Sequence, residues 1–395
     1  MSSFVATVIC VLLLTPVLAS AQPVASDLVS TVREVQQYDF AIHILAMLLV
    51  GFGFLMVFVK RYGYGALTGT YLIVAVGMPS YLALRSTGIL SAEPVGAHTI
   101  KALLLSEFAV ASALIAAGAV PGRIRLYQYA LLALVMVPLY MLNEHLVLDG
   151  GLAATRGFVD AAGSITIHAF GAYFGLGLAV ALTSRRHRDI EVANDPTSNR
   201  FSMIGSMVLW LFWPSFCSAV VPTEQFAATA VNTILALCGA TLATYIVSSL
   251  VGKGKVSIAD MANAALAGGV AIGATCNLVP APLAFGIGLL AGALCVVGYA
   301  VVQPKIQCAF KIVDTCGVHN LHGMPGILGG LIATFVVQGI ATAQLAGIAI
   351  TVTLSLAGGI VAGFILRAAA TRLTVYDDGD EFVGVEAEEP AGAIL

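Results

Sequence analysis

Long apolar stretches separated by short polar gaps recur along the whole chain. A helix needs about 20 mostly apolar residues to cross the hydrocarbon core of a bilayer. Apolar windows bounded by charges, Gly and Pro predict eleven such helices, at residues 40–59, 64–84, 102–120, 126–142, 160–184, 201–221, 226–251, 261–275, 278–302, 312–338 and 343–366. The pattern therefore predicts an all-α integral membrane protein with an eleven-helix domain over residues 40–367.

Composition agrees with a membrane location and excludes several other classes. Of 395 residues, 59% are hydrophobic and 10% are charged, whereas soluble domains carry about 25% charged residues. The net charge of −3 and the lack of a long basic run exclude nucleic acid as a partner. The seven cysteines lack the paired CxxC spacing of zinc and redox sites, so we interpret them as buried apolar residues.

Both ends of the chain differ from the apolar domain. Phe4 to Leu14 is apolar, and Ala19-Ser20-Ala21 is typical of a signal-peptidase site. We expect a signal peptide over residues 1–21 and an extracellular segment over 22–39, although the basic n-region is missing, which leaves an uncleaved extra helix as the alternative. Residues 368–395 are rich in Asp and Glu and predict a solvated cytoplasmic tail without a catalytic role.

The basic residues predict the orientation in the membrane. If the mature N-terminus is outside, fourteen of the eighteen Lys and Arg residues fall in inner loops or the tail. Only Arg33, Arg85, Lys101 and Arg156 fall on or near the outer side. The positive-inside bias therefore predicts a cell-membrane protein with its N-terminus outside and its C-terminus in the cytoplasm, as an odd number of helices requires.

An internal repeat identifies the candidate site. Asp160 to His168 and Asp314 to His322 both read D-x-x-G-x-x-x-x-H. The first copy lies in the fifth predicted helix and the second in the tenth, so they run through the membrane in opposite directions, as in an inverted five-plus-five repeat followed by a final helix. Each His lies about 12 Å along a helix from its Asp, near the middle of the membrane. The two imidazoles are therefore expected to meet.

Paired histidines at this depth indicate function more strongly than a single one would. Ionisable groups inside a membrane are costly and usually mark a pathway or relay. The two aspartates are more consistent with fixing irregular helix entries by accepting hydrogen bonds than with binding an ion. Two alternatives stay open: His319 and His322 as metal ligands, and His168 with His322 as axial ligands of a haem, although the surrounding glycines favour close helix packing.

The chain resembles the ammonium transporter and Rhesus glycoprotein superfamily, and specifically its Rhesus branch. The similar segments are Val50 to Met56, Gly163 to Leu176, Leu209 to Phe216, Leu266 to Val270 and Asp314 to Gly326, the last being highly specific. Together they span nearly all the predicted helices. The resemblance implies a homotrimer in which each subunit has its own pore, with an outer vestibule, an aromatic gate, a twin-histidine lumen and an inner vestibule.

Individual residues carry over from that resemblance. His168 and His322 match the twin histidines of the lumen, and Phe108 and Phe216 match the gate. The pseudo-equivalent aspartates correspond to Asp160 and Asp314, and an acidic residue near the outer mouth corresponds to Glu144.

Two departures from the family pattern affect substrate access. Glu107 stands where the family usually has Asp, and Met261-Ala262-Asn263-Ala264 is less polar than usual. The tryptophan of the outer cation site in the ammonium-transporter branch has no match, since Trp210 and Trp213 are the only tryptophans. A high-affinity external ammonium site is therefore not expected.

The resemblance implies a channel, not an enzyme, with no cofactor and no metal. Ammonium is expected to lose its proton at the outer vestibule and to cross as ammonia, because a desolvated ion at the pore centre costs several kcal/mol. An electroneutral pathway is expected. Alternatives are a carbon dioxide channel, an electrogenic ammonium transporter, a sensor and a haem-binding membrane enzyme.

Overall fold

The computed structural model describes residues 21–90, 99–372 and 374–385, with side chains from residue 31 onward. The described residues form helices without strands. The predicted signal peptide falls almost entirely on residues 1–20, which lie outside this description. The all-helical class predicted from the sequence is confirmed.

Nine helices or runs of consecutive helices in the described part of the chain are long and apolar enough to cross a membrane. They are Thr31–Phe58, Gly63–Ser86, Ile100–Gly118, Leu126–Val147, Ser164–Leu182, Pro196–Ser218, Thr223–Val251, Ala281–Phe310 and Ala341–Ala369. The main labelled helices within them are α2 (Ala21–Ala46), α4 (Gly63–Ser86), α5 (Ile100–Gly118), α6 (Leu126–Val147), α7 (Phe170–Leu182), α9 (Pro196–Ser218), α10 (Phe226–Val251), α13 (Ala281–Val297) and α16 (Ala341–Ala369).

The other two predicted helices are interrupted. The predicted helix 261–275 consists of α11 (Ile258–Asn263), the 3-10 turn η6 (Ala264–Leu266) and α12 (Ala267–Ile272). In place of 312–338, the π-helical turn η8 (His319–Gly323) leads into α15 (Met324–Val336). Residues 311–317 are not helical, so this second element starts later than the hydrophobic pattern predicts.

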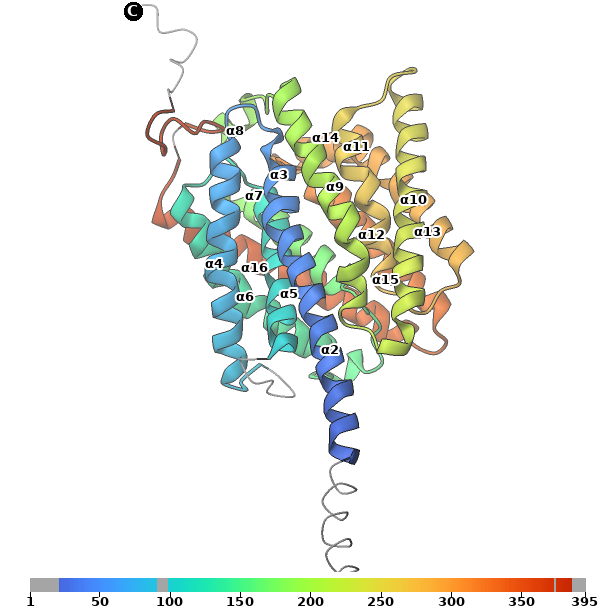
Figure 1. Cartoon of the computed structure of the whole chain (residues 1–395). Coiled ribbons are helices and arrows are strands. Elements are labelled where there is room, and N and C mark those ends of the chain that lie inside the picture. The colour runs from blue at the N-terminus through green and yellow to red at the C-terminus, as the bar shows by residue number, and fades with distance from the viewer. Residues whose placement is uncertain (1–20, 91–98, 373, 386–395) are drawn as a thin grey trace, which may run out of the picture.

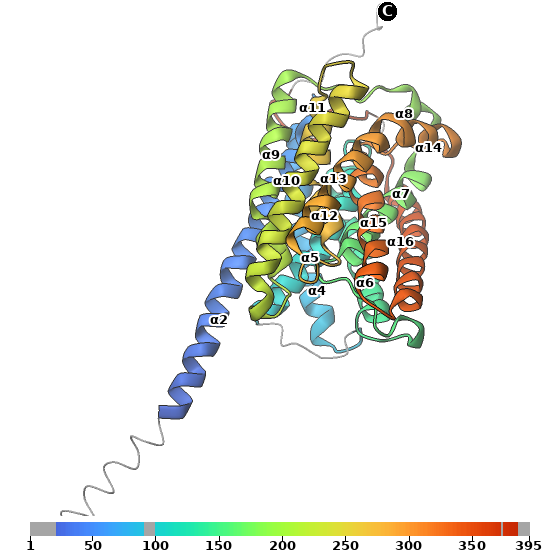
Figure 2. The same cartoon turned by 90° about the vertical axis from the view of Figure 1, so that its right-hand side faces the viewer.

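The helices form one upright bundle (Figures 1 and 2). The N-terminal half of α2 projects beyond the bundle, and α2 begins at Ala21, well before the predicted start at residue 40. Within the bundle, small residues allow the closest approaches. A Cβ added at Gly288 of α13 would lie 2.0 Å from the Ala236 carbonyl oxygen of α10, and one at Gly359 of α16 would lie 2.1 Å from that of Phe174 in α7. Such contacts let backbones pack closely in a membrane, where water does not drive helices together.

Part of the described tail is buried, whereas its composition predicts a solvated extension. Val375 to Asp378 are buried, because the tail folds back against the ends of α4 and α6. Asp378 accepts hydrogen bonds from the amides of Tyr64 (2.7 Å) and Gly65 (2.8 Å), capping the first turn of α4. Arg372 is paired with Glu381 at 2.8 Å. Several of the acidic groups are therefore structural, and the expectation of a solvated tail is wrong for this segment.

Candidate functional site

The two repeat motifs form the same local structure. Gly163 and Gly317 both have positive φ angles, of 77° and 70°, which glycine adopts without steric cost. The π-helical turns η4 (Ser164–Ala169) and η8 follow them and carry His168 and His322. Because a π-helical turn leaves amides without the usual helical partners, each turn needs an acceptor at its start.

The aspartates provide those acceptors. Asp160 Oδ2 accepts from the amides of Ile165 (3.0 Å) and Thr166 (2.7 Å) and from the Thr166 hydroxyl (2.9 Å). The Asp314 carboxylate accepts from the amides of Val318 (3.0 Å) and His319 (3.1 Å). Both carboxylates thus fix the turn that presents a histidine.

The two histidines meet, as the repeat predicts. The Nδ1 atoms of His168 and His322 are 3.2 Å apart, and the rings are nearly parallel with an interplanar angle of 9°. Both side chains are buried. Among the described residues, His168 Nε2 has no hydrogen-bond partner, so this nitrogen can engage a small solute.

A chain of ring contacts continues from the histidines in both directions. Phe216 lies 6.0 Å from His168 and 4.7 Å from Phe108, measured between ring centroids, and the two phenylalanines meet edge to face at 65°. On the other side, Phe52 stacks on His322 at 6.3 Å. The two predicted gate residues are therefore in contact, and one of them, Phe216, lies directly beside a histidine of the pair.

Two cavities flank this chain of rings. The first, of about 410 Å³, includes Phe108, Glu144 and Asp160 in its wall. The second, of about 30 Å³, includes Phe52 and His322. Because the ring contacts run from the wall of one cavity to the wall of the other, the histidines lie between the two.

Glu144 is held in the wall of the first cavity by a polar chain. Its Oε2 accepts a hydrogen bond from the Tyr81 hydroxyl at 2.9 Å, and Arg85 donates to that hydroxyl at 2.9 Å. Glu107, one residue before Phe108, is fully buried, and neither of its carboxyl oxygens has a partner within the described residues.

Three contributors to the site lie in segments that resemble the family, but the sequence alone assigns them no role. Trp213 stacks on His168 at 5.6 Å with an interplanar angle of 21°, and Phe52 covers His322. Trp213 precedes Phe216 by three residues, so the two share a helix face, and this spacing is the signal that could have identified it. Ser164 bridges the site to α12, donating to the Val270 carbonyl and accepting from the Ala274 amide, both at 2.7 Å.

The metal and haem alternatives gain no support from this geometry. In the described portions of the chain, no group of three or more His, Cys, Asp and Glu side chains converges on a point. His319 is directed toward Tyr173, with a ring-centroid separation of 5.7 Å, and does not join the His168–His322 contact.

Comparison with known proteins identifies the family to which the chain belongs. The Ammonium Transporter Family model matches residues 3–389. The chain is 38% identical to Ammonium transporter Rh type B of Oryctolagus cuniculus over 357 residues, which cover 82% of this chain and 76% of that protein. It is also 38% identical to the same protein of Xenopus tropicalis over 362 residues, with coverages of 81% and 75%.

Solved structures agree in fold. A structure of Nitrosomonas europaea Rh50, described as belonging to the Rhesus protein family of channels, superposes with a TM-score of 0.90 at 59% identity, covering 91% of this chain and 94% of that one. Saccharomyces cerevisiae Mep2 superposes with a TM-score of 0.73 at 18% identity, covering 90% and 93%, and so shares the fold. The chain belongs to the ammonium transporter family, in its Rhesus branch.

Proposed function

We propose that each subunit conducts ammonia between His168 and His322. The observation that carries this proposal is the position of the histidine pair, which is buried between two cavities and joined to their walls by ring contacts. A desolvated ammonium ion would be costly at this depth, whereas neutral ammonia would not. Ammonia can also accept or donate a hydrogen bond at a ring nitrogen.

Ammonium reaches the first cavity because that cavity carries acidic side chains. Glu144 and Asp160 line it, and no Lys or Arg is among the described residues of its wall. The ion loses its proton before Phe108 and Phe216, and the proton stays on the outer side. Ammonia then passes the histidines and is protonated again on the inner side, so transport is electroneutral.

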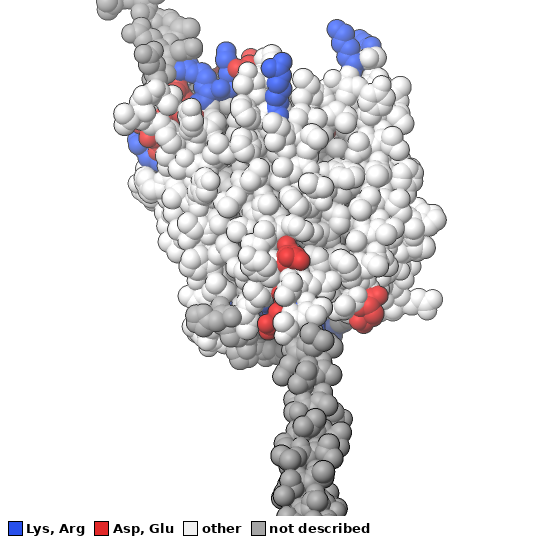
Figure 3. Space-filling model, viewed as in Figure 1, with Lys and Arg blue, Asp and Glu red and all other residues white. Residues whose placement is uncertain are grey.

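The topology follows from the repeat and from the charge distribution. Eleven crossings place Asp160 near the outer face and Asp314 near the inner face, with the N-terminus outside and the C-terminus in the cytoplasm. Figure 3 supports this orientation, because Lys and Arg side chains gather mainly at the end of the bundle where the C-terminal segment lies. The chain acts as a transport protein of the cell membrane and assembles as a homotrimer.

Ion flux and gas flux can be separated in reconstituted vesicles. Solid-supported membrane recording should detect no sustained current after an ammonium jump, while internal pH rises faster than in empty vesicles. A saturable current that disappears in His168→Ala protein would contradict the electroneutral route. If carbon dioxide is the main solute, acidification by carbon dioxide should exceed that of empty vesicles and persist after both histidines are replaced by leucine.

A further inference from the structure

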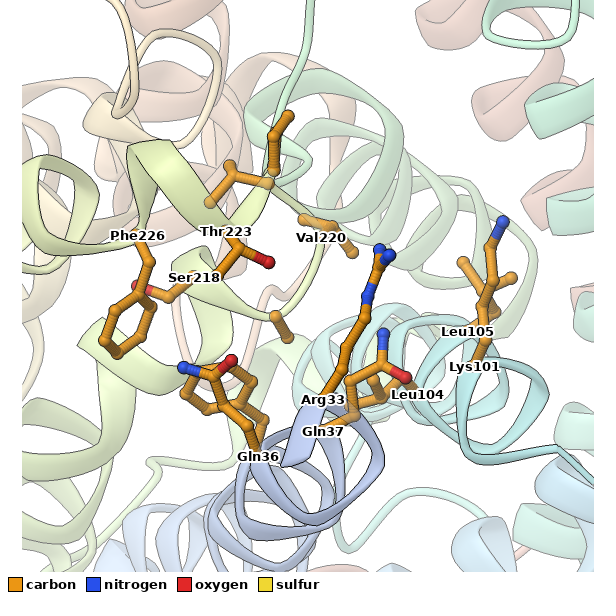
Figure 4. Close-up of a pocket in the computed structure, with 14 residues that line it drawn as sticks. Arg33, Gln36, Gln37, Lys101, Leu104, Leu105, Ser218, Val220, Thr223 and Phe226 are labelled. Carbon is orange, nitrogen blue, oxygen red and sulfur yellow. The ribbon is translucent and has the colours of Figure 1, made fainter. Parts of the chain in front are cut away.

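A third cavity, at the outer end of the bundle, differs in its charge from the first cavity, which is acidic. Its volume is about 410 Å³, and it lies between the N-terminal part of α2, the start of α5 and the connection from α9 to α10 (Figure 4). Arg33 and Lys101 line it, and no Asp or Glu is among the described residues of its wall. Its charge is therefore opposite to that of the cavity that holds Glu144 and Asp160.

The cavity is formed by one face of each helix. From α2 come Arg33, Gln36, Gln37 and Phe40, and from α5 come Lys101, Leu104 and Leu105. Residues spaced by three and four lie on the same face of a helix, so both helices direct a face with a basic residue at its outer end into one space. In Figure 4 the side chains of Arg33 and Lys101 extend in the same direction.

These two basic residues are exceptional for their location. Only four of the eighteen Lys and Arg residues fall on or near the expected outer side, and two of the four line this cavity. Another of the four, Arg85, donates to Tyr81 beside Glu144. Among the residues that the structure describes, no acidic side chain forms an ion pair with Arg33 or Lys101.

A buried hydroxyl in the wall also lacks a partner. Ser218 is 2% exposed, and its Oγ has no hydrogen-bond partner within the described residues. A buried polar group without a partner costs free energy, which a ligand or water in the cavity would recover. The carboxamides of Gln36 and Gln37 add further donors.

We propose that this cavity binds a phosphate group at the outer surface. The Arg guanidinium matches phosphate geometry, and a nearby Lys adds a second positive charge. The wall also has an apolar side, where the rings of Phe40 and Phe226 lie 5.3 Å apart beside Leu104 and Leu105. This mixture fits a phospholipid headgroup, whose phosphate meets the basic residues while the start of its glycerol and acyl region covers the apolar side.

A bound phosphate would also affect the neighbouring acidic cavity. Leu105 and Val220 line both cavities and therefore form a shared wall. Neutralising Arg33 and Lys101 would remove two positive charges from beside the cavity to which ammonium is attracted. The phosphate site itself does not depend on the transport mechanism.

Binding can be measured without any transport assay. Full-length protein in a neutral detergent is titrated with sodium phosphate by calorimetry, against sodium chloride of equal ionic strength, and with phosphatidylglycerol and phosphatidylcholine by native mass spectrometry. The variants are Arg33→Gln, Lys101→Gln and their combination. Arg156→Gln is the matched control, because Arg156 is an exposed outer arginine that does not line the cavity.

We expect the double variant to bind about tenfold more weakly or worse, since it loses two charge-assisted contacts, and Arg156→Gln to bind as the unmodified protein does. Binding of phosphatidylglycerol without free phosphate assigns the site to a lipid headgroup, and binding of free phosphate assigns it to a soluble ion. The proposal is overturned if neither probe binds, if the double variant retains full affinity, or if Arg156→Gln weakens binding equally. Matching thermal unfolding of all variants excludes misfolding as the cause.

Discussion

His168 and His322 face each other through their Nδ1 atoms, 3.2 Å apart, with ring planes only 9° from parallel. A neutral imidazole carries a hydrogen on one nitrogen and a lone pair on the other, so a contact between like atoms requires one ring to donate and its partner to accept. If both rings were protonated, two N–H groups would point at each other. The geometry therefore fits a pair with no more than one positive charge, which suits the passage of a neutral solute.

The Asp160 carboxylate is expected to stabilise the turn that carries His168. Replacing Asp160 by Ala leaves three donors without an acceptor, so we expect a loss of about 1–3 kcal/mol in the free energy of unfolding, because each donor is buried. Asp160→Asn keeps one acceptor oxygen, so its free energy of unfolding should fall by less. Thermal unfolding in detergent measures both, with Asp189→Ala as the exposed control. Equal stability of Asp160→Ala and Asp189→Ala would refute the capping role.

Glu144 is expected to concentrate ammonium at the outer cavity. Glu144→Gln removes the charge but keeps an acceptor for Tyr81, so we expect about a two- to fivefold slower flux at low salt, with a smaller effect at high salt. The measurement is vesicle alkalinisation at several ionic strengths. Glu34→Gln, an exposed acid on α2 that does not line this cavity, is the control. An effect of Glu144→Gln that is independent of salt would argue against electrostatic attraction.

The edge-to-face pair of Phe108 and Phe216 is expected to limit passage of larger solutes and water. Replacing both by Ala removes the rings between the outer cavity and His168, so osmotic water permeability of the vesicles should rise above that of the unmodified protein. Phe335→Ala, at a side chain that is 87% exposed, should leave permeability unchanged. A double variant that folds normally yet remains as impermeable as the parent would show that these rings are not the barrier.

The cap formed by Asp378 is expected to hold the C-terminal segment against the bundle. Asp378→Ala removes the acceptor for the Tyr64 and Gly65 amides, at a cost of about 1 kcal/mol, and should expose Glu381 to a glutamate-specific protease. Mass spectrometry of the released fragment gives the rate of cleavage at Glu381. Asp380→Ala is the control, because Asp380 is exposed in the same segment. Unchanged cleavage in Asp378→Ala would mean that other contacts hold the segment.

The sequence predicts the components of the site because they depend on a long motif with fixed spacing. The D-x-x-G-x-x-x-x-H repeat predicts that His168 meets His322, and the family resemblance predicts that Phe108 and Phe216 form the gate. In the structure the residues of each pair are in contact. The interpretation of the aspartates as hydrogen-bond acceptors also agrees with the geometry around Asp160. Each of these predictions follows from local backbone requirements or from a specific motif.

Features that depend on long-range packing could not be predicted. A tryptophan in an apolar helix has many possible neighbours, so the spacing from Phe216 shows which helix face Trp213 occupies but not that its ring covers His168. The acidic composition of the tail predicts a solvated segment. In the structure, however, Asp378 accepts hydrogen bonds from amides at the start of a helix more than 300 residues earlier in the chain. Hydropathy also treats residues 312–338 as one helix, because it does not detect the turn at Gly317.

The most direct test of the central claim is stopped-flow recording of internal pH in proteoliposomes under an inward ammonium gradient. The preparations are the unmodified protein, His168→Leu/His322→Leu, His43→Leu and empty vesicles. His43 is the matched control, because it is a histidine within a membrane span that forms a hydrogen bond with Ser215 at 2.9 Å and does not take part in the His168–His322 contact. The account predicts fast alkalinisation with the unmodified protein and His43→Leu, and a changed rate with the double variant. Alkalinisation no faster than in empty vesicles, or a double variant identical to the parent, would contradict it.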